Sequence, residues 1–346
     1  MKKIAIIAGL LSGLLFGIAT PFSKLLLANL NSFQLAGLLY IGAGIAMIPA
    51  ILKTGSQLRL LFNRSNLIRT IGIILFGGLL GPLLLMIGLR AADAASVSIW
   101  LNMELVATAI LGVLIFKDSL DKFTWIGVGF TICAGVITSM GEGVSGLTSA
   151  LLITAACFCW GVDNHLTALT DGATPQAVTF IKGMVAGAVN LLIGISIADS
   201  NFVFNNAVFA ALIVGGFSYG LSIVLYVTSA QNIGATRGQI LFSTAPLWGV
   251  ILSYVFFQDT FHWTHLISIL FLIIAVIVIN LNAHKHKHQH EVLEHIHYHT
   301  HEDGHHDHVH ENDNLNTEKG HSHLHVHKSI MHEHPHYPDL HHRHPH

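Results

Sequence analysis

Two stretches of the sequence, LNMELVATAILGVLIFKD at residues 101–118 and FSTAPLWGVILSYVFFQD at residues 242–259, resemble each other and decide the fold. Other short matches lie at nearly the same offset and in the same order. They are Phe16-Gly17 with Trp160-Gly161, and Phe76-Gly77-Gly78 with Val214-Gly215-Gly216. Self-similarity at a fixed offset indicates an internal repeat. Residues 4–140 and 148–282 are therefore interpreted as two copies of one unit.

The composition predicts that both copies lie in a membrane. Of the 346 residues, 52% are hydrophobic and 10% are charged, whereas soluble domains carry about 25% charged residues. A membrane-spanning helix needs about 20 apolar residues. Ten segments qualify: 4–27, 32–52, 68–89, 94–116, 122–140, 148–169, 176–198, 207–229, 235–257 and 264–282. We expect an all-α membrane protein of about ten transmembrane helices.

Each copy contains an odd number of spans, so the second copy is inverted in the membrane relative to the first. We expect two inverted five-helix repeats, in residues 1–141 and 146–282, followed by a disordered tail at 283–346. Lysine and arginine are enriched in cytoplasmic loops of membrane proteins. The basic residues gather on one side if the N-terminus is cytoplasmic: Lys2, Lys3, Lys53, Arg59, Arg64, Arg69, Lys117, Lys122 and Arg237. This bias predicts a multi-pass protein of a bacterial-type inner membrane with both termini in the cytoplasm.

The first of the two stretches also resembles a known family. Residues 100–108 read WLNMELVAT, and the apolar run that follows closes on Asp118. This pattern is similar to the hallmark of EamA-type transporters in the drug/metabolite transporter superfamily. Two features depart from it, because Leu105 stands where the family has proline, and Asp118 and Asp259 stand where glutamate is usual. The resemblance implies ten helices and the carriage of small metabolites or drugs.

Polar residues inside apolar spans are the candidates for a transport pathway, because charge at membrane depth is costly and needs a reason. Glu104 is expected to bind a proton or cation, with Asn102 beside it. Asp163 and Lys182 are candidates for an ion pair. The complete set of candidates is Asn102, Glu104, Asp163, His165, Lys182 and Pro246. The alternatives are helix–helix hydrogen bonds for the polar groups and interfacial positions for Lys182.

The tail is rich in histidine, since it holds every histidine of the chain except His165, His262 and His265. Neutral imidazole binds zinc, nickel, cobalt and copper(II), so we expect transition-metal binding. The candidate ligands are His284, His286, His288, His290, His295, His297, His299, His301, His305, His306, His308, His310, His321, His323, His325 and His327. A tail that only responds to pH, or that has no role, is the alternative. No cofactor is expected to be required.

Three functional hypotheses remain open at this point. The first is a secondary transporter that exports a divalent transition metal, with the tail as collector or sensor. The second is a carrier of a small organic metabolite, such as an amino acid or a nucleoside-like compound, whose tail only buffers or senses metal. The third is a membrane-anchored metal-storage protein that transports nothing. The expected partners are the lipid bilayer and a small solute or metal ion, while proton coupling and a homodimer are left open. The sequence has no enzyme motif, and a net charge of -2 does not favour nucleic acid.

Overall fold

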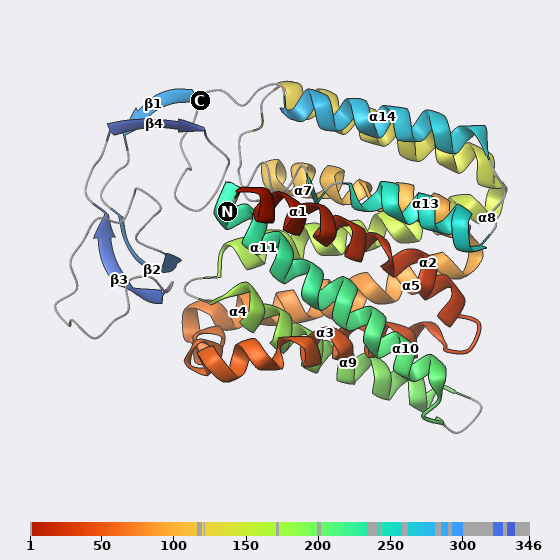
Figure 1. The fold of residues 1–346 in the computed structure, drawn as a ribbon, viewed down its shortest axis with the longest axis horizontal. Coiled ribbons are helices and arrows are strands. Elements are labelled where there is room, and N and C mark those ends of the chain that lie inside the picture. Colours follow the sequence, from red (N-terminus) through yellow and green to blue (C-terminus); the bar gives the residue numbers. More distant parts are fainter. Residues whose placement is uncertain are drawn as a thin grey trace.

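The protein is a bundle of long helices in the computed structural model (Figure 1). The structure describes residues 2–115, 120, 122–170, 173–198, 202–233, 241–242, 244–257, 262–280, 285–289, 293–299, 321–327 and 331–335. Expectations for Asp118, Arg237 and Asp259, and for the tail residues His284, His290, His301, His305, His306, His308 and His310, lie outside these residues.

The first half of the bundle runs from α1 to the bend within α8. Its elements are α1 (Lys2–Gly17), α2 (Ala19–Leu26), α3 (Ser32–Thr54), the 3-10 helix η1 (Gly55–Phe62), α4 (Arg64–Gly72), the π-helix η2 (Ile73–Leu80), α5 (Gly81–Ala91), α6 (Ala94–Trp100), α7 (Met103–Leu114) and α8 (Lys122–Ala168). Within α8 the backbone reverses at Gly143, whose φ is 69°. The fifth and sixth spans therefore meet there without an intervening loop.

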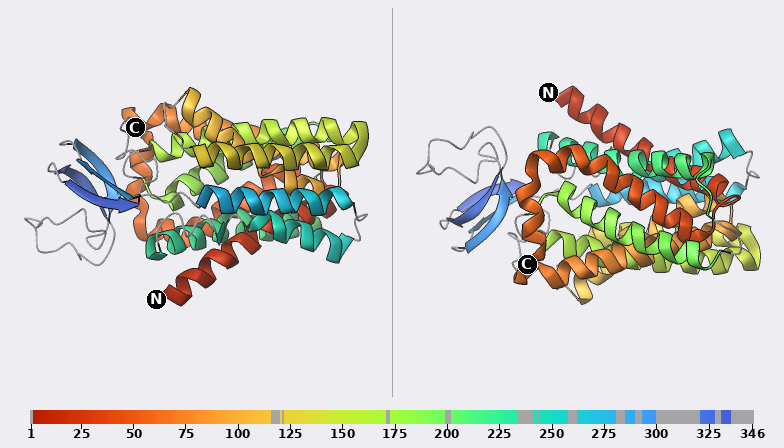
Figure 2. Two further views of the ribbon diagram at one scale, coloured as in Figure 1. Left: turned by 90° about the horizontal axis from the view of Figure 1, so that it is seen from above. Right: turned by 90° about the horizontal axis from the view of Figure 1, so that it is seen from below.

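The second half continues from α8. Its elements are α9 (Pro175–Ser196), α10 (Asn206–Gly215), the π-helix η3 (Gly216–Leu221), α11 (Ser222–Ile233), α13 (Ala245–Phe257) and α14 (Trp263–Asn280). In the two views of Figure 2 the first turns of α1 diverge from the bundle. The same turns leave Ile4 and Ile7 exposed.

The predicted ten-helix architecture is confirmed. The described residues contain eight helices long and apolar enough to cross a membrane, and two shorter apolar helices, Ala245–Phe256 and Trp263–Val278. The predicted ninth span, 235–257, is described only in part. The start of α1 and the end of α14 lie toward the same end of the bundle (Figure 1), as an even number of spans requires.

Corresponding helices of the two repeats are broken at corresponding places. The third helix of each repeat contains a π-helical segment, η2 in the first and η3 in the second. The fourth helix of the first repeat is interrupted at Leu101 and Asn102, between α6 and α7, although Leu105 replaces the proline expected nearby. Its counterpart α13 begins at Ala245-Pro246. A proline is therefore not needed for the break in the first repeat.

Small residues bring α3 and α9 together, and these are the second helices of their repeats. A Cβ atom on Gly37 would lie 2.5 Å from the Leu191 backbone nitrogen, and one on Gly183 would lie 2.6 Å from the Tyr40 carbonyl oxygen. Glycine permits such close approach of two helix backbones in a membrane. The second helices of the two repeats therefore pack directly against each other.

The described part of the tail comprises residues 285–289, 293–299, 321–327 and 331–335. It contains four short strands: β1 (Lys285–Gln289), β2 (Leu293–His299), β3 (His321–His327) and β4 (Met331–Pro335). They form two antiparallel pairs, β1 with β4 and β2 with β3. Histidine recurs at every second position in all four strands, and this period-two pattern favours a strand.

Candidate functional site

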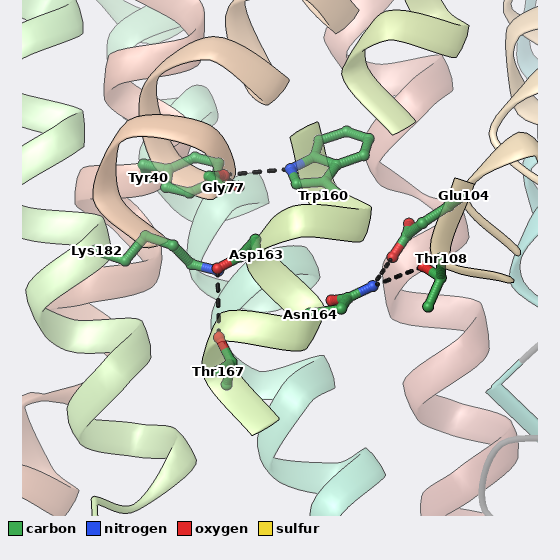
Figure 3. A network of polar contacts seen from close by, with 9 residues as sticks. All are labelled: Tyr40, Gly77, Glu104, Thr108, Trp160, Asp163, Asn164, Thr167 and Lys182. Atoms are coloured by element: carbon green, nitrogen blue, oxygen red, sulfur yellow. Dashed lines mark hydrogen bonds and ion pairs between the residues drawn. The ribbon is translucent and has the colours of Figure 1, made fainter. Parts of the chain in front are cut away.

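The centre of the site is the carbonyl group of Gly77, in the π-helix η2. A π-helix shifts the backbone hydrogen-bond pattern and is frequent at functional sites. The Tyr40 hydroxyl donates to the Gly77 oxygen at 2.7 Å, and the Trp160 indole nitrogen donates to it at 3.2 Å (Figure 3). One backbone oxygen thus joins α3, η2 and the second part of α8.

An ion pair lies directly against the same glycine. Lys182 of α9 donates to Oδ2 of Asp163 at 2.6 Å, and Thr167 donates to Oδ1 at 3.3 Å. Asp163 is buried, with 4% of its surface exposed. A Cβ atom on Gly77 would overlap the Asp163 carboxyl group. The pairing of Asp163 with Lys182, hypothesised from the sequence, is confirmed.

The second carboxylate of the site, Glu104 of α7, has a different environment. The amide nitrogen of Asn164 donates to Oε1 of Glu104 at 2.8 Å, and lies 3.5 Å from the Thr108 hydroxyl (Figure 3). Lys182 interacts with Glu104 electrostatically. However, the ion pair described in this region is that of Lys182 with Asp163. Glu104 is half-buried and Asn164 is exposed, so the Glu104 residue is less buried than Asp163.

Aromatic rings from both repeats lie near the two carboxylates. The Tyr219 ring of η3 is 5.5 Å from the Tyr40 ring and 5.6 Å from the Phe16 ring, between centroids. Phe16 in turn lies 5.3 Å from Phe242. The Tyr219 hydroxyl interacts electrostatically with Glu104. A row of rings therefore connects the two repeats near Glu104.

Comparison with known proteins agrees with this architecture. The sequence profile of the EamA-like transporter family matches residues 3–140 and 147–281. The chain belongs to this family. A relative described as an uncharacterized transporter of Methanothermobacter thermautotrophicus is 26% identical over 267 residues, which cover 71% of this chain and 77% of the relative. A protein of known crystal structure, 17% identical, superposes with a TM-score of 0.57 over 81% of this chain and 98% of its own, and shows the fold alone.

The EamA-like chain is thus a multi-pass membrane transporter.

Three other predicted site residues are also described. The Asn102 amide donates to the Ile99 carbonyl oxygen at 3.0 Å. His165 Nδ1 lies 2.8 Å from the Gly161 carbonyl oxygen on its own helix. Pro246 lies in the first turn of α13.

The metal-exporter hypothesis needs several ligands in one place. Where the side chains are described, no group of three or more His, Cys, Asp or Glu residues is arranged to hold a metal ion. Asp163 and His165 are two residues apart on one helix, so they point to different faces. Of the candidate residues in the spans, Asp163 is held in an ion pair with Lys182.

A second polar cluster lies outside the predicted site. His265 of α14 contacts the Ser96 hydroxyl at 2.7 Å through Nε2 and the Tyr254 hydroxyl at 2.6 Å through Nδ1. Ser96 also donates to Glu142. The four residues come from four helices, so no sequence spacing could have revealed them. The one signal for this cluster in the sequence is the polar residue His265 inside an apolar run.

Proposed function

We propose that this EamA-like transporter is a secondary carrier of a small organic solute that bears a protonated amine, and that Glu104 exchanges this solute for a proton. The observation that carries the proposal is the contrast in charge at the site. Asp163 is neutralised by Lys182 at 2.6 Å, while the hydrogen-bond partner of Glu104 is a neutral amide. An ionisable residue at membrane depth that faces the interior marks a substrate or proton pathway.

The aromatic row supports the choice of an organic cation. Rings attract a cation to their faces, and sites for small molecules combine apolar and aromatic walls with a few polar groups. The rings of Phe16 and Tyr40 each contact the ring of Tyr219, which interacts electrostatically with Glu104. A proton and an ammonium group compete for one carboxylate, so occupancy by one releases the other.

The test is proton movement in proteoliposomes that contain the full-length protein and an entrapped pH-sensitive dye. A panel of amino acids, aliphatic amines and nucleosides is added outside in turn. We expect at least one ammonium-bearing solute to drive proton movement, and the substitution Glu104→Gln to abolish it. Glu142→Gln is the matched control, because it removes a carboxylate from the second polar cluster, and it should retain the proton movement.

Three outcomes would contradict the proposal. Proton movement driven only by neutral nucleosides would overturn the substrate class. Solute-driven proton movement that survives Glu104→Gln would overturn the role of Glu104. If Ni²⁺, Co²⁺ or Zn²⁺ is taken up in a manner that Glu104→Gln abolishes, the membrane part is a metal carrier instead. The wild-type protein and Glu104→Gln carry the same tail, so metal that the tail binds passively contributes equally to both measurements.

A further inference from the structure

The strands β2 and β3 of the tail are aligned so that histidine lies opposite histidine. The two strands are antiparallel. The register pairs His295 with His325, His297 with His323 and His299 with His321. Between these pairs, Ile296 lies opposite Leu324 and Tyr298 lies opposite Ser322. In this register, histidine pairs therefore alternate with pairs of other residues along the ribbon.

The period of a strand places the three histidine pairs on one face of the ribbon. Successive residues of a strand alternate between its two faces, so positions i and i+2 share a face. Residues directly opposite on antiparallel strands have Cβ atoms about 4.5–5.5 Å apart. Neighbouring pairs follow at about 6.5–7 Å along the strand. Two neighbouring pairs thus place four histidine positions close together on one face of the ribbon.

The second ribbon of the tail repeats this arrangement. The register of β1 with β4 pairs His286 with His334 and His288 with His332. Both ribbons combine segments that are far apart in the sequence, with residues 300–320 between β2 and β3. If the positions of the histidines were unimportant, matched histidine pairs would not be expected in both ribbons.

We propose that the β2–β3 ribbon is a binding site for a divalent first-row transition metal, in which the neighbouring pairs His295/His325 and His297/His323 supply four imidazole ligands. Four nitrogen ligands suit a tetrahedral ion such as Zn²⁺ or Co²⁺. Metal binding at this site requires histidines that lie opposite each other on the two strands. The total number of histidines in the tail does not determine it. Metal binding fixes the pairing of β2 with β3 and so ties together the two ends of residues 300–320. The proposal does not depend on what the membrane part transports.

The first experiment measures binding of Co²⁺ to the full-length protein in lipid nanodiscs, followed by competition with Zn²⁺. Tetrahedral Co²⁺ is recognised by its visible absorption. All proteins in the series carry glutamine at the β1–β4 pairs, so that only one ribbon remains: His286→Gln, His288→Gln, His332→Gln and His334→Gln. The ribbon variant adds His295→Gln, His297→Gln, His323→Gln and His325→Gln. The matched control instead adds His305→Gln, His306→Gln, His308→Gln and His310→Gln.

The two variants lose the same number of histidines from the same tail. We expect the ribbon variant to bind Co²⁺ more than about tenfold more weakly and to lose the tetrahedral spectrum. The control should bind like its parent. Equal weakening in both variants would overturn the proposal, because it would mean that any histidines of the tail suffice.

The second experiment reads the register directly. Tyr298→Cys with Ser322→Cys places two thiols at directly opposite positions, which is within the Cα separation of a disulfide. Tyr298→Cys with Val326→Cys is the mismatched control. Under mild oxidation, Zn²⁺ should increase disulfide formation in the first protein and leave the second unchanged, as measured by mass spectrometry of proteolytic fragments. Equal yields in the two proteins would overturn the proposed register. Both experiments are repeated with Glu104→Gln, which should change neither result.

Discussion

Asp163 and Glu104 are two carboxylates in neighbouring helices of the same network, yet their surroundings differ. Asp163 is buried, paired with Lys182 and pressed against Gly77. Glu104 is half-buried and accepts a hydrogen bond from the Asn164 amide. A buried charge is tolerated only when it is paired, whereas the donor described for Glu104 is a neutral amide. The comparison separates a group that holds helices together from the group that we propose to serve transport.

The largest effect on stability is expected from Lys182→Met. It leaves the Asp163 carboxylate buried and unpaired, and breaking a buried pair typically costs about 3–5 kcal/mol. The double substitution Asp163→Asn with Lys182→Met should recover most of the loss. Thermal unfolding in detergent, followed by fluorescence-detected size exclusion, measures both. If the single variant is as stable as the wild type, Asp163 is not held by this pair.

A smaller loss is expected from Gly77→Ala. The added methyl group would collide with the Asp163 carboxyl group, and overpacking of this kind costs about 1–3 kcal/mol. Gly129→Ala is the matched control, because a Cβ atom there would meet nothing within 4 Å. The same unfolding assay should separate the two variants. Equal melting temperatures of Gly77→Ala and Gly129→Ala would show that the Asp163 side chain can move away from η2.

A still smaller loss is expected from Tyr40→Phe. It removes one of the two donors to the Gly77 oxygen, and a single hydrogen bond contributes about 0.5–1.5 kcal/mol. Trp160→Phe removes the other donor. With both donors gone the buried carbonyl group is left without these partners, so the double variant should lose more than the sum of the single losses. Simple additivity in the double-mutant cycle would contradict a shared acceptor.

The smallest effect on stability is expected from Glu104→Gln. The glutamine side chain keeps an oxygen for the Asn164 amide, so the melting temperature should change little, while coupled transport is lost. The opposite pattern, a large drop in melting temperature with transport retained, would place Glu104 in the same structural role as Asp163. This variant therefore tests most directly whether Glu104 and Asp163 have different roles.

The sequence predicted the spans and one ion pair because these follow from local composition and from charge at membrane depth. The apolar runs gave the helices to within a few residues, and the opposite charges of Asp163 and Lys182 suggested their pairing. The repeat also pointed to Gly77 through its match with Gly215, though not to the role of its carbonyl group.

Other parts of the site could not be predicted because they depend on how distant helices pack. The two donors to Gly77 come from α3 and α8, and no local pattern brings them together. The same holds for Ser96 and His265, which lie 169 positions apart. In the tail, the alternation of histidine indicates a high density of metal ligands but does not determine which strands pair, because residues 300–320 separate β2 from β3.

The reversal at Gly143 has a consequence for how the two repeats are joined. A φ of 69° is a left-handed conformation, which glycine adopts without the penalty of about 1–2 kcal/mol that other residues incur. Because no loop separates the spans on its two sides, the last span of the first repeat and the first span of the second form one helical hairpin. A residue with a side chain at this position would strain the backbone at the boundary between the repeats.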